Sequence, residues 1–198
     1  SDDLRREMSN ISVKAAKDVG YIGVGTIEYI YDSSSDKFYF MEMNTRIQVE
    51  HPVTEMVTQT DLIKEQIKVA YGNKLEIKQE DITITGHSIE CRINAEHPIT
   101  FIPSPGNIKQ YHQPGGLGVR VDSAMYQGYD ISPHYDSMIS KLIVYGDTRK
   151  DCIQKLKRAL EEYVIIGIDT NIQLHQKIIQ SDDFASGNYD INFMSRFD

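Results

Sequence analysis

Apolar residues near the start of the chain recur at three- and four-residue spacing, which is the pattern of an amphipathic helix. The stripe consists of Leu4, Met8, Ile11 and Ala15. Gly20 follows it, at a place where helices often end in a left-handed glycine. The pattern therefore predicts a helix over residues 2–18.

Two β-rich runs come next, and a short polar segment separates them. Residues 23–31 read GVGTIEYIY, and residues 38–49 read FYFMEMNTRIQV. Between them, residues 32–36 read DSSSD, which is typical of a turn. Two strand-like runs joined by a short polar turn predict a β-hairpin.

The dipeptide His51-Pro52 is expected to break the chain after this hairpin. Residues 53–71 then return to helical spacing, and Gly72 closes them. Asp61 is expected to cap a second helical segment inside this stretch, because aspartate is a favoured N-cap residue.

The second half of the chain mixes both kinds of element. Alternation over residues 86–95 and an apolar run at 141–145 predict strands, while residues 147–163 and 171–179 predict helices. The first of these helices has an apolar inner face made of Cys152, Ile153, Leu156 and Leu160. Short strands and turns are expected between the two predicted strands, where prolines and glycines cluster.

Residues 73–85 are polar and irregular, and they are the predicted domain boundary. The chain is therefore expected to hold one domain over residues 1–80 and another over residues 86–198. Helices and strands follow one another in mixed order, which places the fold in the α+β class.

Composition narrows the class of protein further. The chain has 198 residues, of which 40% are hydrophobic and 25% charged, an ordinary globular composition. A net charge of −8 without a basic cluster argues against nucleic-acid binding. No apolar run approaches the ~20 residues that span a bilayer. Only two cysteines occur, Cys91 and Cys152, so a reduced, cytoplasmic protein is expected.

Five polar residues occupy every second position at the end of the hairpin. They are Glu42, Asn44, Arg46, Gln48 and Glu50. In an extended strand, residues at this spacing share one face. Two interpretations stay open from the residues alone, a solvent-exposed strand face and a binding site for a metal ion with phosphates.

The partner strand brings a further carboxylate to this face. If the turn is centred near Ser35, Glu28 lies opposite Glu42, with Thr26 opposite Asn44 as a flanking pair. The other flanking pair is then Ile30 and Phe40. Like charges directly opposite destabilise a sheet, and a divalent cation between them removes that penalty.

The residues around this hairpin resemble the signature of the biotin-dependent carboxylases. The run is MEMNTRIQVEHPVTEM, with GTIEYIY before it and DLIKEQ after it. Four further segments resemble the C-terminal domain of the same family: GHSIECRINAEHP, FIPSPGNI, PHYDSMISKLIVYG and GIDTNIQLH. The resemblance covers nearly the whole chain, and it identifies the chain as resembling the C-terminal half of a biotin carboxylase.

This resemblance implies a fold, a reaction and partners. Residues 1–80 would be the C-terminal part of an ATP-grasp domain, and residues 86–198 the biotin carboxylase C-terminal domain. ATP and bicarbonate would be used to carboxylate biotin on a biotin carboxyl carrier protein, with Mg²⁺ or Mn²⁺ as the metal. Carboxyltransferase subunits and a second copy in a homodimer are the other implied partners.

The resemblance also carries over metal and nucleotide ligands. Glu28 and Glu42 match ligands of the metal and ATP, and Asn44 matches a further metal ligand. Arg92 in ECRINAE matches a residue that stabilises the biotin enolate and contacts bicarbonate.

Bicarbonate would be held by a second group of residues. Arg46, Gln48 and the backbone of Val49 match the bicarbonate site of the family. Glu50 matches the general base that removes the proton from bicarbonate. A surface salt bridge is the plain alternative for an arginine beside glutamates.

Other parts of the family pattern are missing from this sequence. The glycine-rich loop that covers the phosphates lies upstream in the family, as do lysines that hold ATP and bicarbonate. The chain is therefore expected to be a fragment, a processed product or part of a longer polypeptide, and to be inactive alone. Pro52 after the histidine favours acetyl-CoA carboxylase.

Several alternatives stay open. They are the biotin carboxylase part of a propionyl-CoA, methylcrotonyl-CoA or pyruvate carboxylase, another ATP-grasp ligase such as a carbamoyl-phosphate synthetase domain, and a non-catalytic piece for dimerisation or carrier docking.

Overall fold

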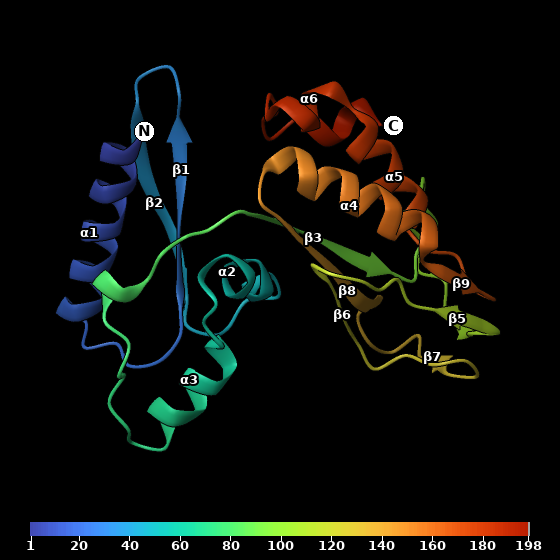
Figure 1. Ribbon diagram of the computed structural model, residues 1–198, viewed down its shortest axis with the longest axis horizontal. Helices are drawn as coiled ribbons and strands as arrows, with labels where there is room; N and C mark the ends of the chain where they lie inside the picture. Colours follow the sequence, from blue (N-terminus) through green and yellow to red (C-terminus); the bar gives the residue numbers. More distant parts are fainter. Residues whose placement is uncertain (198) are drawn as a thin grey trace. The chain divides into compact units, whose positions relative to one another are not determined.

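The computed structural model describes residues 1–197, which form two compact units (Figure 1). One unit contains residues 1–51 and 59–82, and the other contains residues 52–58 and 83–197. Helices and strands are mixed in both, which agrees with the predicted α+β class. The assignment of residues 1–80 and 86–198 to two family domains stays a prediction.

The first unit holds one hairpin and a few helices. Its elements are α1 (Asp2–Asp18), β1 (Thr26–Asp32), β2 (Lys37–Asn44), α3 (Leu62–Ala70) and the short 3₁₀ helix η1 (Gln79–Asp81). Helix α1 has the predicted bounds. Gly20 follows it at a φ of +66°, and the amides of Gly20 and Tyr21 donate to carbonyls of its last turn. This is the left-handed ending that the glycine predicts.

Strands β1 and β2 pair antiparallel in the predicted register at one end. Glu28 lies opposite Glu42, and Thr26 lies opposite Asn44. The predicted convergence of two carboxylates on one rung of the ladder is therefore confirmed.

The other predicted pair is wrong by one residue. Ile30 lies opposite Tyr39, whereas the sequence predicts Phe40 as its partner. The register shifts just after Glu28, because a bulge leaves Met41 as an extra residue on β2. A bulge of this kind adds twist near functional sites, and the polar alternation does not reveal it.

The second strand is also shorter than predicted. It ends at Asn44, and residues 45–50 form no strand, with a bend at Arg46 and a turn at residues 49–50. Only two of the five alternating polar residues, Glu42 and Asn44, therefore lie on a strand. The idea that all five share one strand face is wrong.

The expected break at His51-Pro52 is instead the start of helix α2 (His51–Thr58). Proline is tolerated in the first turn of a helix, because amides there have no partner in the helix to lose. The later part of the helical prediction holds: Asp61 caps α3 by accepting a 2.8 Å hydrogen bond from the Lys64 amide. Gly72 ends that helix at a φ of +99°.

The second unit is larger and contains most strands. Its elements after α2 are β3 (His87–Asn94), β4 (Gly106–Asn107), β5 (Gln110–His112), β6 (Val119–Ser123), β7 (Asp130–Ile131), β8 (Met138–Gly146), α4 (Arg149–Glu162), β9 (Val164–Ile166), α5 (Ile172–Gln180), α6 (Asp182–Ser186) and the 3₁₀ helix η2 (Phe193–Arg196). Strands β3, β8 and β6 form an antiparallel sheet in that order, and two smaller ladders pair β4 with β7 and β5 with β9.

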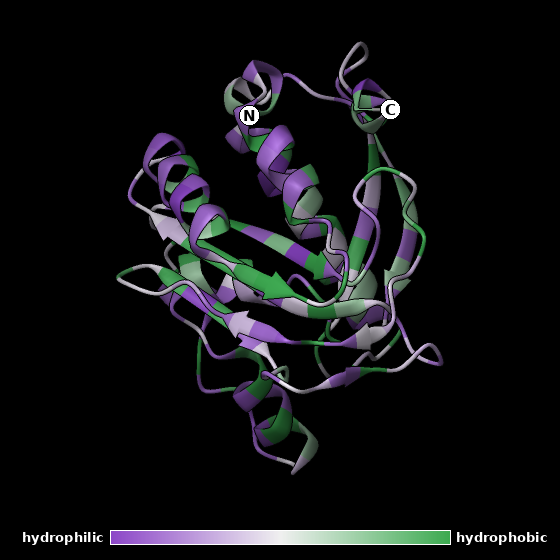
Figure 2. Cartoon of the chain, turned by 90° about the vertical axis from the view of Figure 1, so that its right-hand side faces the viewer, coloured by the Kyte–Doolittle hydropathy of each residue, from purple (hydrophilic) through white to green (hydrophobic). Residues whose placement is uncertain are grey.

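The hydrophobic core lies between this sheet and helix α4. All four residues predicted for the inner face of α4 are buried: Cys152, Ile153, Leu156 and Leu160. They pack in one cluster with Cys91, Ile93, Leu142 and Val144 from β3 and β8. Figure 2 shows the hydrophobic colour along parts of the strands in the middle of the view, and much hydrophilic colour on the helices.

The first unit lacks such a core within the described residues. Every buried hydrophobic residue of residues 1–197 belongs to the second unit. Large apolar side chains of the hairpin stay exposed, including Phe40 at 63%. A two-stranded hairpin alone is only marginally stable. Much of the apolar surface of this unit is exposed to solvent. Within residues 1–197, no helix has the length and apolar character to cross a bilayer.

Candidate active site

Two carboxylates and one amide meet on the hairpin. Glu28 of β1 and Glu42 of β2 are direct partners in the ladder. Asn44 lies beside them, and its Nδ2 donates to Glu28 Oε1 at 2.9 Å and to Glu42 Oε1 at 3.0 Å. One amide group therefore bridges the two carboxylates and lowers the repulsion between them.

Gln48 returns to the same carboxylate from beyond the strand. Its Nε2 donates to Glu28 Oε1 at 2.7 Å. The turn that brings it back is held by His51, whose Nδ1 lies 2.8 Å from the Gln48 carbonyl oxygen. The His51 ring nitrogen is the donor here, because a carbonyl oxygen only accepts. Glu28 Oε1 thus has two amide donors, one from the last residue of β2 and one from the segment that follows the strand.

Arg46 lies in the turn between these two amides. Its Nη2 donates to Asn44 Oδ1 at 3.3 Å, and its Nη1 donates to the Ile47 carbonyl at 3.2 Å. The two terminal nitrogens of the guanidinium are thus both held by the hairpin end, and the side chain is exposed to solvent. Val49 is half-buried, and the exposed Glu50 directly precedes α2.

Arg92 belongs to the second unit. It lies on β3 directly opposite Lys141 of β8, and its side chain is exposed. Its backbone carbonyl accepts two hydrogen bonds from residues of α5 and the preceding turn, Asn171 and His175. The structure thus gathers seven of the eight predicted site residues on one hairpin and its following turn, and places the eighth on the other unit.

The residues of the hairpin fit a divalent cation such as Mg²⁺ or Mn²⁺. Glu28 and Glu42 offer carboxylate oxygens, which such ions prefer. The Asn44 amide nitrogen lies within 3.0 Å of both carboxylates, where it takes the place of positive charge. Within residues 1–197, no group of three His, Cys, Asp or Glu side chains forms a metal cluster. A cation here would therefore need further oxygen ligands, such as nucleotide phosphates.

Sequence reasoning missed a charge network in the second unit. Arg120 on β6 holds Asp122 with two hydrogen bonds of 2.7 and 2.8 Å, and it donates a third of 2.8 Å to Glu55 on α2. Hydrogen bonding to Asp122 is the largest cause that raises the pKa of Arg120. Burial works to raise the pKa of Asp122, but the hydrogen bonds and charges of Arg120 and Lys141 outweigh it and lower that pKa.

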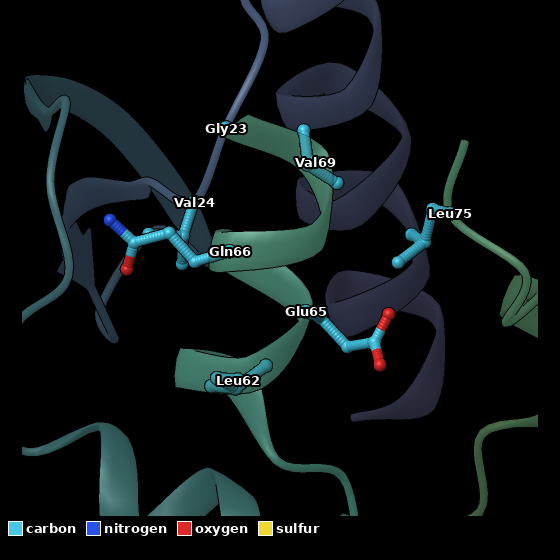
Figure 3. Close-up of a pocket in the computed structure, with 7 residues that line it drawn as sticks. All are labelled: Gly23, Val24, Leu62, Glu65, Gln66, Val69 and Leu75. Atoms are coloured by element: carbon cyan, nitrogen blue, oxygen red, sulfur yellow. The ribbon is translucent and has the colours of Figure 1, made fainter. Parts of the chain in front are cut away.

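A hollow of about 190 Å³ lies beside α3 in the first unit (Figure 3). It is lined by Gly23, Val24, Leu62, Glu65, Gln66, Val69 and Leu75. Figure 3 shows Glu65 and Gln66 leaving α3 on opposite sides, and the Glu65 carboxylate accepts a 2.8 Å hydrogen bond from Lys68. The hollow contains none of the predicted site residues.

Comparison with protein families decides what kind of chain this is. The model of the biotin carboxylase C-terminal domain matches residues 90–196, which is more than half of the chain. The chain belongs to the biotin carboxylase family. The model of the carbamoyl-phosphate synthase L chain ATP binding domain matches residues 1–78. Because residues 90–196 match the biotin carboxylase domain, the alternative of a carbamoyl-phosphate synthetase is not favoured.

Known members of the biotin carboxylase family are similar to this chain along nearly all of its length. Biotin carboxylase 1 of Bacillus subtilis is 60% identical over 197 residues, which is 99% of this chain and 44% of that protein. A pyruvate carboxylase component of Methanothermobacter thermautotrophicus is 53% identical over 98% of this chain and 40% of that protein. The chain thus spans less than half the length of these relatives.

A solved structure gives the same result. A biotin carboxylase from Campylobacter jejuni in a complex with β,γ-ATP matches with a TM-score of 0.95 and 47% identity, over 99% of this chain and 44% of that one. The resemblance seen in the sequence, and the ATP-grasp and biotin carboxylase fold that it implies, are therefore confirmed.

Proposed function

We propose that this chain supplies one part of the active site of a biotin carboxylase. The whole enzyme would use ATP and bicarbonate to carboxylate biotin on a biotin carboxyl carrier protein. The observation that carries this proposal is the convergence of Asn44 and Gln48 on Glu28, with Glu42 as its ladder partner. Family membership supplies the reaction class.

Glu28, Glu42 and Asn44 would hold the metal ion that accompanies ATP. Asn44 would turn its carboxamide so that the oxygen faces the cation. When bound, Mg²⁺ or Mn²⁺ would neutralise charge on the phosphates during transfer. Before the ion binds, the amide nitrogens of Asn44 and Gln48 keep the two carboxylates close together at low cost.

Arg46, Gln48 and the backbone amide of Val49 would bind bicarbonate. The guanidinium of Arg46 suits a planar anion, because it can donate two parallel hydrogen bonds. Its present bonds to Asn44 and Ile47 hold the side chain in the turn. Glu50, at the end of that turn, would act as the base that accepts the bicarbonate proton.

Arg92 would supply fixed positive charge where an oxyanion develops on biotin, and it would also contact bicarbonate. Biotin would arrive on the carrier protein, and carboxyltransferase subunits would use the product. We further propose a homodimer in the cytoplasm. The Hydrogenobacter thermophilus 2-oxoglutarate carboxylase domain, 46% identical with a TM-score of 0.96 over 99% of this chain and 43% of that one, is described as a dimer with MgADP and bicarbonate.

Acetyl-CoA is the proposed final acceptor, which would place the enzyme in fatty acid synthesis. The support is the resemblance of the run that ends in His51 and Pro52 to the acyl-CoA carboxylases, since pyruvate carboxylases tend to have threonine after the histidine. Propionyl-CoA, methylcrotonyl-CoA and pyruvate are the competing acceptors. Mixing the enzyme and carrier with each class of carboxyltransferase would identify the acceptor that becomes labelled from bicarbonate.

The proposal is tested by ATP cleavage that depends on biotin and bicarbonate. The longer protein that contains this chain is expected to show it, and residues 1–198 alone are expected to show none. Glu50→Gln should remove nearly all biotin-dependent turnover, while Glu80→Gln, an exposed carboxylate of η1, should leave it unchanged. ATP cleavage by residues 1–198 alone would contradict the proposal that this chain holds only part of the active site. Full activity of Glu50→Gln would contradict the role of Glu50 as the base. A chain that forms a dimer and ignores nucleotide would favour the non-catalytic alternative.

A further inference from the structure

Strand β3 has one free edge in its sheet, and Arg92 lies on it. The sheet order is β3, β8, β6, so β3 pairs with β8 on one side only. Free edge amides and carbonyls are costly unless they find partners. Near Arg92 those partners come from Asn171, the N-cap residue of α5, rather than from another strand.

Asn171 forms hydrogen bonds with the backbone groups of this edge, as a neighbouring strand would. Its Nδ2 donates to the Arg92 carbonyl at 3.0 Å, and its Oδ1 accepts from the Asn94 amide at 2.9 Å. Its backbone amide donates to the Asn94 carbonyl at 3.2 Å. Asn171 is only 7% exposed, so these bonds are shielded from water. Loss of such buried bonds leaves polar groups without partners, which costs about 1–3 kcal/mol for each group.

His175 adds a second donor to the same carbonyl. It lies one helical turn after Asn171, and its Nε2 is 2.9 Å from the Arg92 carbonyl oxygen. Helix α5, which follows Asn171 and carries His175, is itself fixed, because its Ile172, Leu174 and Ile179 are buried. The backbone of Arg92 is therefore tied to a helix that is anchored in the core.

The tie lies beside an irregularity in the strand. The register of β3 against β8 shifts between Ile93 and Asn94, one residue beyond Arg92. A bulge disrupts the ladder locally and re-aims nearby side chains. The four bonds from Asn171 and His175 fix the backbone on both sides of the shift.

We propose that Asn171 and His175 are positioning residues for Arg92. They hold its backbone at the free edge of β3, and they thereby aim the exposed guanidinium. The inference rests on the proposed function, in which Arg92 contacts bicarbonate and stabilises the biotin enolate. Neither residue touches substrate in this role, and both act through Arg92.

The test uses the longer enzyme that contains this chain, with free biotin as substrate. Asn171→Ala and His175→Leu are expected to lower kcat for biotin-dependent ATP cleavage about tenfold, since small misplacements of a catalytic group cost that much or more. The KM for ATP should not change, because the proposed ATP ligands lie in the other unit. His175→Gln keeps a donor near the position of Nε2 and should restore most of the loss.

A double-variant comparison separates positioning from a general structural effect. In an Arg92→Ala background, His175→Leu should cause no further loss of kcat, because it acts only through Arg92. Gln173→Ala, an exposed residue of the same helix, is the matched control and should behave as the unmodified enzyme. Full kcat in both single variants, or an equal further loss in the Arg92→Ala background, would overturn the proposal.

Failure of the proposed function gives a different result. An unmodified enzyme without biotin-dependent cleavage, or an Arg92→Ala variant with full activity, would overturn the role of Arg92 itself. Hydrogen exchange on residues 1–198 tests the physical tie separately. Asn171→Ala should speed exchange of the Asn94 amide at least about tenfold, in line with the loss of a buried hydrogen bond. Unchanged protection there would show that Asn171 does not hold the strand edge.

Discussion

Gln48 donates a 2.7 Å hydrogen bond to Glu28, although Gln48 lies beyond the end of its strand and Glu28 is on the neighbouring strand. Replacing Gln48 with leucine should therefore loosen the hairpin, because Glu28 loses one of its two amide donors. We expect a loss of about 1 kcal/mol for this bond. It should appear as roughly fivefold faster hydrogen exchange of the β1 and β2 amides. Gln79→Leu, an exposed residue of the same unit, is the control. Equal exchange in both variants would contradict the structural role of Gln48.

The carboxylate pair should bind Mn²⁺ without the rest of the enzyme, though weakly. Paramagnetic Mn²⁺ should broaden the NMR signals of Asn44 in the isolated chain, since its side chain lies within 3.0 Å of both carboxylates. Glu28→Gln should remove this broadening, because one carboxylate alone is a poor ligand set. Asp36→Asn, in the hairpin turn, should leave it unchanged. If Asp36→Asn removes the broadening and Glu28→Gln does not, the ion binds at the turn.

The hairpin shows which parts of the site the sequence can predict. Alternation and turn position place Glu28 opposite Glu42, because both depend on local spacing. They fail at Ile30 and in the length of β2, because a bulge and a turn depend on the surrounding structure. Gln48 still reaches Glu28, but through a turn that His51 holds and not through a shared strand face.

The contacts that tie Arg92 were beyond the reach of sequence patterns. Asn171 and His175 meet Arg92 across more than seventy residues of sequence, and each contributes one hydrogen bond to its carbonyl oxygen. An asparagine ahead of a helix predicts a cap for that helix. Here its side chain serves a strand edge and does not cap α5. Family resemblance supplied Arg92 itself, which spacing alone would have left as a surface cation.

Leu156 should carry far more stability than an apolar residue of the first unit. It is 1% exposed and packs in the core cluster, so Leu156→Ala should cost about 2–5 kcal/mol. Ile67 on α3 is 64% exposed, and Ile67→Ala should change stability by less than about 0.5 kcal/mol. Urea unfolding of the two variants measures the difference. Similar losses in both would contradict the placement of the core in the second unit.

Arg120 is expected to resist replacement by lysine. Its guanidinium binds Asp122 through two hydrogen bonds and Glu55 through a third, and the Glu55 side chain is only 10% exposed. A lysine keeps the charge but not this geometry, so Arg120→Lys should cost about 1–3 kcal/mol. Arg158→Lys is the control. The ion pair of Arg158 with Glu162 lies at the surface and should contribute less than about 1 kcal/mol to the free energy of unfolding. Urea midpoints that shift equally in both would contradict the importance of the network.

Stability should also depend on pH through His175. Burial lowers the pKa of this histidine below its ordinary value, and the hydrogen bond to the Arg92 carbonyl only partly offsets that effect. The unfolded chain therefore binds a proton at higher pH than the folded chain does. The contribution of His175 to the free energy of unfolding is fully present above the ordinary histidine pKa of about 6.5. It is lost as the pH falls toward the lower pKa of the folded chain. The free-energy difference between the unmodified chain and His175→Gln should thus decrease between about pH 7.5 and about pH 5, since glutamine does not titrate. A difference that stays constant over this range would show that His175 titrates alike in the folded and unfolded chains.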